Sequence, residues 1–190
     1  MRQSGRDRGF TIVELLVVVV IITILASIGI PRMTRERIAA EGRDFAALVT
    51  SELQRARMDA VGSRLPQYAF IYADRVEVRS AKPGATPTAA LVAPTTGDPI
   101  MHGVRAKPGV SVLDVVNAAA TPASTLSTTT AKQVVFNSVG VGYLGPTPPA
   151  VPSPVIVYID NTTARPGHPD RHLRVDVSPL TGFVQLVTGW

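Results

Sequence analysis

The sequence predicts an α+β fold in which a long N-terminal helix packs on an antiparallel β-sheet head. Residues 10–30 form a nearly unbroken apolar run, and helical spacing of apolar residues resumes from Met33 to Val61. After residue 64 the pattern changes to short alternating or apolar runs, separated by connections rich in Pro and Gly. Helix first and strands afterwards is the element order of an α+β protein.

The first 31 residues combine a basic leader with a hydrophobic helix. Three arginines precede Gly9, and the apolar run begins at Phe10. A helix over residues 10–30 would be roughly 30 Å long, enough for a bilayer core. Positive charge before the run predicts a cytoplasmic N-terminus. Three interpretations are open at this point: a signal peptide cut near Ala26, a permanent single-span anchor, or a segment that follows a cleaved leader.

One carboxylate, Glu14, interrupts the apolar run. A charged side chain costs on the order of a few kcal/mol at the bilayer centre, and neither a signal peptide nor a plain anchor gains from it. A carboxylate next to a buried α-amine costs far less than two isolated charges. We therefore expect Glu14 to have a specific cationic partner.

The segment Gly9-Phe10-Thr11, followed by Glu14 and two leucines, resembles the N-terminal signature of type IV pilins and type II secretion pseudopilins. The resemblance implies that prepilin peptidase cleaves between Gly9 and Phe10 and that the new N-terminal Phe10 becomes N-methylated. It also implies that Glu14 neutralises the α-amine of its own or a neighbouring subunit, and so sets the register between subunits. Because pseudopilins at the extreme tip tend to lack this glutamate, its presence implies that another subunit sits above this one.

Gly29 and Pro31 lie where the apolar run ends. Proline removes a backbone hydrogen bond, so we expect a kink here, with the end of the helix as the alternative. The resemblance to pilins implies the same kink. Residues 32–63 then predict an amphipathic helix that stops at Gly62-Ser63. Its apolar stripe, expected to pack on the sheet, contains Ile38, Phe45, Leu48, Val49, Leu53, Ala56, Ala60 and Val61.

The head comprises residues 64–190. Stretches rich in Pro, Thr and Ala at 82–99, 118–130 and 145–154 are expected to be loops. Residues 178–182 predict a hairpin connection. Together with the anchor, this closing pattern resembles the heads of GspH/FimT-type minor pilins and pseudopilins. The strand candidates are 68–72, 75–79, 110–116, 133–137, 155–159, 173–177 and 183–187.

Catalytic and metal-binding patterns are weak. The chain has no cysteine, which excludes disulfides and thiolate metal sites. His168 and His172 flank Asp170, but metal sites usually need three or four converging ligands, so we expect a polar loop. Asp160-Asn161-Thr162-Thr163 lacks EF-hand spacing, and we expect a turn rather than a calcium site. With no nucleophile motif or phosphate loop, the sequence predicts no enzyme, no metal and no cofactor.

The formal net charge of +5 permits an acidic partner without requiring one. FimT-type minor pilins bind DNA through a basic Gly-Arg-x-Arg element near the C-terminus, but no arginine follows Gly182 over the next three residues. Arg165, Arg171 and Arg174 form a substitute cluster suited to phosphate. Two nearby aspartates dilute it, so DNA binding is an alternative to a solvated basic rim.

The resemblance implies a minor pilin or pseudopilin with four segments: a leader (1–9), a transmembrane and filament-core helix (10–31), an amphipathic helix (32–63) and the head (64–190). The subunit would cross the bacterial inner membrane once, with its head in the periplasm. It would then enter a type IV pilus near the tip and prime assembly. The alternatives are a type II secretion minor pseudopilin, a DNA-binding minor pilin for natural transformation, and an adhesive tip subunit.

The partners implied by the same resemblance are proteins of filament assembly and lipid. Prepilin peptidase and the inner-membrane assembly platform would act on the subunit, and membrane lipid would surround its helix before assembly. The major pilin and other minor pilins or pseudopilins would contact it afterwards. DNA is a possible further partner, although the sequence does not favour it.

Overall fold

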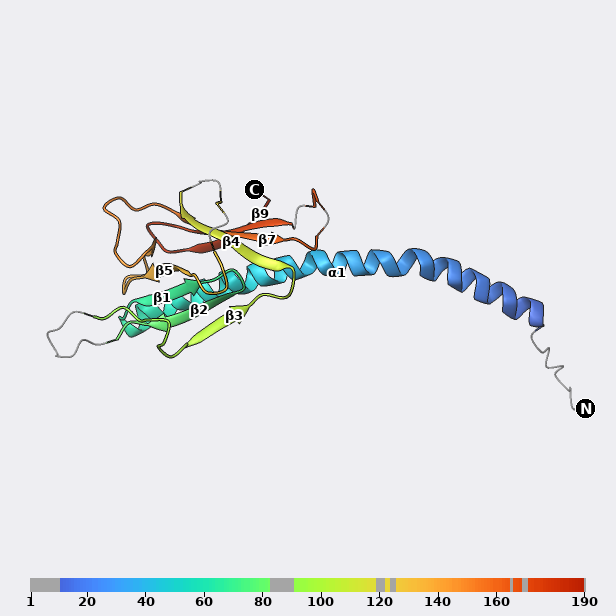
Figure 1. The fold of residues 1–190 in the computed structure, drawn as a ribbon, viewed down its shortest axis with the longest axis horizontal. Coiled ribbons are helices and arrows are strands. Elements are labelled where there is room, and N and C mark those ends of the chain that lie inside the picture. Colours follow the sequence, from blue (N-terminus) through green and yellow to red (C-terminus); the bar gives the residue numbers. More distant parts are fainter. Residues whose placement is uncertain are drawn as a thin grey trace, which may run out of the picture. The chain divides into compact units, whose positions relative to one another are not determined.

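The computed structural model describes residues 11–82, 91–118, 122–123, 126–164, 166–168 and 171–189, without the side chains of 28–36, 38 and 39. Figure 1 shows one long helix, α1 (Ile12–Ser63), followed by strands. The chain divides into two compact units, residues 1–37 and 38–190. The strands are β1 (Gln67–Ile71), β2 (Arg75–Ser80), β3 (His102–Arg105), β4 (Val110–Asn117), β5 (Lys132–Phe136), β6 (Gly142–Leu144), β7 (Val155–Asn161), β8 (His172–Val177) and β9 (Val184–Thr188).

Two hydroxyls that interrupt the apolar run are accommodated within the helix. Thr23 Oγ1 donates to the Val19 carbonyl oxygen at 2.7 Å, and Ser27 Oγ donates to the Ile24 carbonyl oxygen at 2.7 Å. Such bonds to the preceding turn satisfy the hydroxyl without any partner outside the helix. These polar residues are therefore compatible with an apolar environment around the helix.

The helix continues through Gly29 and Pro31 without a break. The alternative in which Pro31 ends the helix is therefore wrong. One missing backbone hydrogen bond is tolerated when the neighbouring turns are intact. The kink at Gly29 and Pro31 stays a prediction, because both side chains lie outside those that the structure describes.

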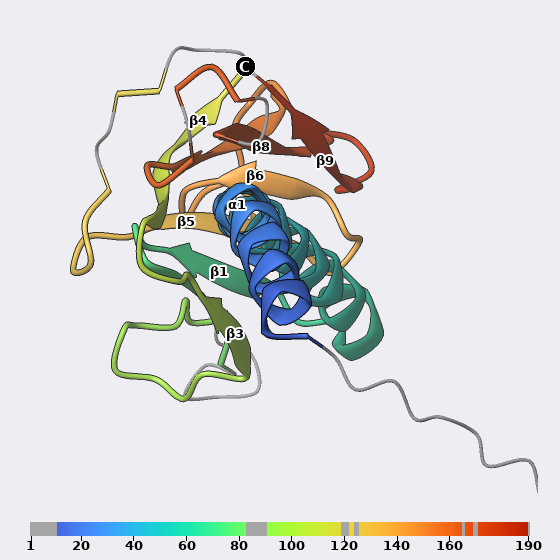
Figure 2. The same cartoon turned by 90° about the vertical axis from the view of Figure 1, so that its right-hand side faces the viewer.

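In the second unit, the last turns of α1 pack against two antiparallel sheets. The five-stranded sheet has the order β3-β2-β1-β5-β6, and the four-stranded sheet has the order β4-β7-β8-β9. Figure 2 looks along α1 and shows strands of both sheets beside the helix. The α+β class is confirmed, but the expected single sheet is split in two, because β4 pairs with β7 rather than with its sequence neighbours.

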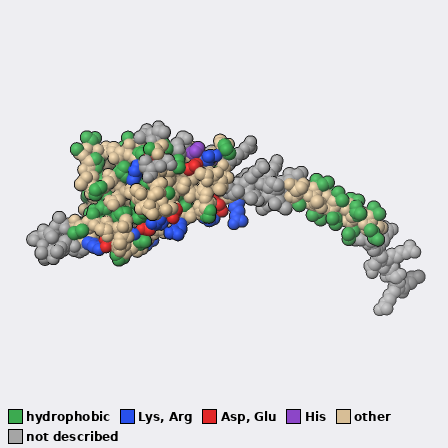
Figure 3. Space-filling model, viewed as in Figure 1, with side chains coloured by type: hydrophobic (Ala, Val, Ile, Leu, Met, Phe, Trp, Pro, Cys, Tyr) green, Lys and Arg blue, Asp and Glu red, His purple; other side chains and the backbone are tan. Residues whose placement is uncertain are grey.

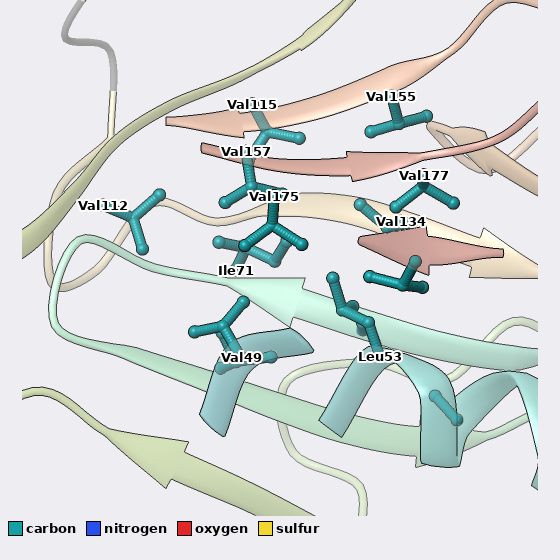
Figure 4. Packing of buried hydrophobic residues seen from close by; sticks show 14 of the residues in the cluster. Val49, Leu53, Ile71, Val112, Val115, Val134, Val155, Val157, Val175 and Val177 are labelled. Atoms are coloured by element: carbon teal, nitrogen blue, oxygen red, sulfur yellow. The ribbon is translucent and has the colours of Figure 1, made fainter. Parts of the chain in front are cut away.

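The core lies between the helix and the inward faces of both sheets. Helix residues at three- and four-residue spacing join one hydrophobic cluster with residues of both sheets. In Figure 4, Val49 and Leu53 lie on the helix next to Ile71 of β1, with Val175 and Val177 of β8 above. The buried helix residues are Phe45, Ala46, Val49, Leu53, Ala56 and Ala60.

Two members of the predicted stripe are not in the core. Leu48 is 49% exposed and Val61 is 47% exposed, whereas Ala46, which we did not include, is fully buried. Successive helical residues point about 100° apart, so Val49 and Ala60 take the inward positions and their apolar neighbours Leu48 and Val61 face outward. The side chain of Ile38 lies outside the described set.

Every predicted strand is present within one or two residues of its expected bounds, and β8 and β9 form the expected hairpin. Two short strands, β3 and β6, were missed. Gly103 in β3 approaches β2 so closely that an added Cβ would overlap the Val76 carbonyl oxygen. A glycine in a strand of four residues weakens the alternation pattern, although here it permits the close pairing.

Candidate functional site

The N-terminal part of α1 is apolar on all sides. Large hydrophobic side chains from Ile12 to Leu25 are exposed, from 45% at Val18 to 87% at Ile12. Figure 3 shows hydrophobic side chains along this part of the helix. A helix that is hydrophobic all round needs an apolar environment that the chain itself does not supply here. In the part of the chain that is described, no helix meets both the length and the apolar character of a membrane span.

The first turn of this helix is capped by Thr11. Its carbonyl oxygen accepts the Leu15 N–H at 3.1 Å, and its hydroxyl oxygen accepts the Glu14 N–H at 3.2 Å. Threonine is a favoured N-cap, and a glutamate three residues later completes the spacing of a capping box. The sequence analysis missed this role of Thr11, although the Thr-x-x-Glu spacing was a usable signal.

Glu14 lies in the first turn of α1 and is exposed. The N-terminal end of a helix carries a partial positive charge, which favours a carboxylate there by about 0.3–1 kcal/mol. The Glu14 carboxylate thus lies beside the start of the helix, among exposed apolar side chains of the described residues.

In the head, the predicted basic cluster is paired with carboxylates. Arg171 Nε lies 3.7 Å from Asp160 Oδ1, and Arg174 Nη2 lies 3.1 Å from Asp176 Oδ2. His172 Nδ1 also faces Asp160 Oδ1 at 3.4 Å. Both described arginines therefore have much of their charge compensated, which disfavours a bare phosphate-binding surface. Arg165 lies outside the described residues.

The turn expected at 160–163 begins later, at Thr162, because Asp160 and Asn161 are the last two residues of β7. Asn161 is buried, and its Oδ1 accepts the Thr163 N–H at 3.2 Å and the Thr163 hydroxyl at 2.6 Å. This is the local side-chain pattern by which asparagine stabilises turns. Across the described residues, no group of three or more His, Asp or Glu side chains is placed to hold a metal ion. Asp170 is not among the residues described.

A groove of about 590 Å³ lies beside the turn that joins β8 and β9. Arg57 of α1 forms part of its wall, and its Nε donates to the carbonyl oxygens of Gly140 at 3.3 Å and Thr181 at 2.7 Å. The sequence analysis missed Arg57, because nothing distinguishes it locally from the other arginines of the helix. The lining residues are Arg57, Pro154, Asp176, Val177, Ser178, Pro179, Thr181, Phe183 and Gln185.

The chain matches known proteins in its N-terminal segment and in its fold. Residues 4–30 match the prokaryotic N-terminal methylation motif. The fold is similar to that of the minor pseudopilin EpsH from the type 2 secretion system of Vibrio cholerae, with a TM-score of 0.50 and 15% identity. That similarity covers 77% of this chain and 95% of EpsH. The N-terminal segment therefore carries a prokaryotic methylation motif, and the fold is similar to that of a minor pseudopilin.

The fold also resembles that of the type IV minor pilin FimU of Pseudomonas aeruginosa, with a TM-score of 0.44 and 14% identity. The similarity covers 83% of this chain and 90% of FimU. No curated protein matches the chain. The closing hairpin that the sequence predicted is present in this fold as the β8–β9 pair.

The residues around the predicted cleavage site lie at the edge of the described structure. Gly9 and Phe10, the predicted cleavage residues, lie outside the described range, whereas Thr11 and Glu14 are placed in the first helical turn. The structure therefore brings together the cap and the acid next to the predicted new N-terminus. It does not gather Arg171 and Arg174 into an unpaired cationic surface.

Proposed function

We propose that this chain is a minor subunit incorporated near the tip of a type IV pilus, where it primes filament assembly. One observation carries the proposal: from Ile12 to Leu25 an exposed and predominantly apolar helix begins with a capped turn that contains the Glu14 carboxylate. The apolar surface supplies the attraction to other subunit helices. The carboxylate supplies the specificity, because only one axial register brings a cation to it.

In this proposal, prepilin peptidase cleaves between Gly9 and Phe10, and Phe10 is then N-methylated. Cleavage creates an α-amine one residue before the Thr11 cap. The methyl group keeps this amine a cation, and the Glu14 carboxylate of the same or a neighbouring subunit neutralises it. An unpaired amine among apolar helices would cost several kcal/mol, so correct stacking is favoured over slipped arrangements.

Before assembly, the apolar helix would reside in the lipid of the bacterial inner membrane, with the N-terminus in the cytoplasm and the head in the periplasm. Exposure of every large side chain from Ile12 to Leu25 supports an apolar surrounding for this segment. The assembly platform in that membrane would extract the subunit and add it beneath or beside the other minor pilins. The major pilin would follow.

A direct test compares Glu14→Leu with Asp44→Asn, which removes a negative charge from an exposed position of the same helix. We expect Glu14→Leu to prevent incorporation, since breaking a buried ion pair costs about 3–5 kcal/mol. Asp44→Asn should incorporate like the original chain. The measurement is the share of subunit in sheared filaments relative to membranes, together with the number of filaments per cell. Unchanged values for Glu14→Leu would refute the priming role.

A minor pseudopilin of type II secretion is the second candidate, and the similarity of the fold to EpsH supports it. In vivo cross-linking followed by mass spectrometry of the partners separates the two systems. Recovery of a major pilin with pilus minor subunits would support the pilus. Recovery of secretion pseudopilins with an outer-membrane secretin would move this chain to secretion while leaving the role of Glu14 intact.

DNA capture and surface adhesion are less well supported than the two assembly roles. The carboxylate partners of Arg171 and Arg174 weaken the case for DNA. If DNA binding nevertheless occurs, replacing Arg165, Arg171 and Arg174 with Ala should abolish it and leave piliation intact. For adhesion, shortening the loop 145–154 should reduce surface attachment without affecting assembly.

A further inference from the structure

His102 joins the edge strand β3 to helix α1. Its Nδ1 contacts Glu52 Oε2, and its Nε2 lies 3.2 Å from Asp59 Oδ2. The imidazole is only 6% exposed, while the Glu52 side chain is 16% exposed and the Asp59 side chain is 37% exposed. A histidine about 50 residues away from its partners in sequence therefore bridges two carboxylates that lie two helical turns apart.

The protonation state of the ring decides whether both contacts are favourable. A carboxylate accepts hydrogen bonds and donates none, so each ring nitrogen needs a proton to bond its carboxylate. The imidazolium has both protons. A neutral ring has one, and its other nitrogen then presents a lone pair to a carboxylate oxygen, which is repulsive. Charge-assisted bonds of this kind are also about twice as strong as neutral ones.

The charged groups around His102 are few. From α1, Glu52 and Asp59 contact the ring, and Arg55 Nε lies 3.9 Å from Asp59 Oδ2. From β2, the register partner of His102 is the uncharged Val78, which is buried in the core on the helix side of the sheet. Because side chains alternate along a strand, the neighbouring Glu77 and Arg79 of β2 face away from the helix. On β3 itself, Arg105 is exposed.

We propose that Glu52, His102 and Asp59 form a protonation-dependent clamp that fastens β3 to α1 when the imidazole is charged. When the ring becomes neutral, it keeps its proton on Nδ1 for the less exposed Glu52 and loses the bond from Nε2 to Asp59. The Asp59 carboxylate is then hydrated by solvent, because its side chain is partly exposed. The clamp is thus closed on the acidic side and half open on the alkaline side.

The consequence concerns the edge of the five-stranded sheet. β3 pairs with β2 alone, over the four residues from His102 to Arg105. Val104 also packs on the core, and Ala106 just after the strand donates to the Asp74 carbonyl oxygen at 2.8 Å, so the bond to Asp59 adds one protonation-dependent part to the attachment of β3. Ambient pH would therefore regulate how often this edge opens. The inference does not depend on the function proposed above.

The test is amide hydrogen exchange of the β3 segment in the full chain in detergent, at pH values from about 5 to 8.5 and corrected for intrinsic exchange. We expect protection of residues 102–105 to fall about tenfold across that range, the size expected for losing one charge-assisted hydrogen bond. Protection of β7, which lies in the other sheet, should change much less.

Asp59→Asn is the decisive variant. An asparagine amide donates as well as accepts, so it can bond the lone pair of a neutral Nε2. We expect β3 in this variant to keep its protection at alkaline pH, whereas Asp44→Asn, the matched charge loss at an exposed position, should retain the full pH response. Equal pH responses in the two variants would overturn the clamp.

The ring itself gives an independent measurement that does not rely on any variant folding. The chain has three histidines, so the ¹⁵N shifts of His102 can be separated from those of His168 and His172. We expect two bound protons under the conditions in which β3 is protected, and one, on Nδ1, where that protection is lost. A ring that stays neutral over the whole range, or a proton retained on Nε2 instead, would overturn the proposal.

Discussion

Arg57 of α1 is hydrogen-bonded to Thr181, which lies 124 residues further along the chain. Its Nε donates to the Thr181 carbonyl oxygen at 2.7 Å and to the Gly140 carbonyl oxygen at 3.3 Å. One side chain therefore fastens two turns to the helix, one from each sheet. The turn after β5 and the turn after β8 are held at the same end of the head by this contact.

Replacing Arg57 with Met should lower the free energy of unfolding by about 1–3 kcal/mol, because two carbonyl oxygens lose a charged donor. Urea denaturation of the full chain in detergent measures the change. Arg55→Met is the control, since the Arg55 side chain is 59% exposed and has only a long contact with Asp59. Equal losses in the two variants would show that Arg57 acts through its bulk or charge rather than through these bonds.

Gly182 is required by both its backbone angle and its surroundings. Its φ is +63°, and an added Cβ would overlap the carbonyl oxygen of Gly140. We expect Gly182→Ala to destabilise the head by more than the roughly 1–2 kcal/mol that a left-handed conformation alone costs an L-residue. Gly167→Ala isolates that backbone contribution, because φ is +79° there and no atom lies within 4 Å of the added Cβ. Thermal unfolding of both variants tests the difference.

Glu77 makes a contribution to stability that depends on pH. Burial alone would raise the pKa of Glu77, but hydrogen bonds from Arg75 and Arg79 outweigh it and leave the pKa below its ordinary value. A lowered pKa in the folded state stabilises the protein above the unfolded pKa of about 4.3, and this contribution is lost as the pH falls through the folded value. Melting temperatures below pH 5 should fall less steeply in Glu77→Gln. An unchanged slope would contradict the assignment.

Thr11→Val should fray the start of α1. The substitution keeps the shape of the side chain and removes the hydroxyl that accepts the Glu14 N–H, at a typical cost of about 1 kcal/mol. We expect lower filament incorporation than for Thr11→Ser, which keeps the cap. Amide exchange at Glu14 provides the physical measurement. If Thr11→Val were incorporated as well as the original chain and Thr11→Ser less well, side-chain bulk rather than the hydroxyl would matter, and the cap would have no role.

Sequence patterns succeeded where the signal is local and contiguous. The apolar run matches the N-terminal motif, and the alternating strands β2 and β8 and the turn ending at Gly182 are confirmed in the fold. Each of these signals lies within one short stretch. They failed for β3 and β6, which have four and three residues and contain glycine. They also failed for Leu48, because apolar spacing does not reveal which edge of a stripe faces outward.

By itself, the sequence determined the fold class, a long helix followed by a β-rich head, and the N-terminal methylation motif. These features can be recognised from local periodicity and from a short motif, because neither depends on long-range contacts. Only the tertiary structure decided the two sheets, the attachment of both turns by Arg57, and the placing of His102 between Glu52 and Asp59. Each depends on residues far apart in the chain, whose meeting is set by how the whole core packs and not by any nearby pattern.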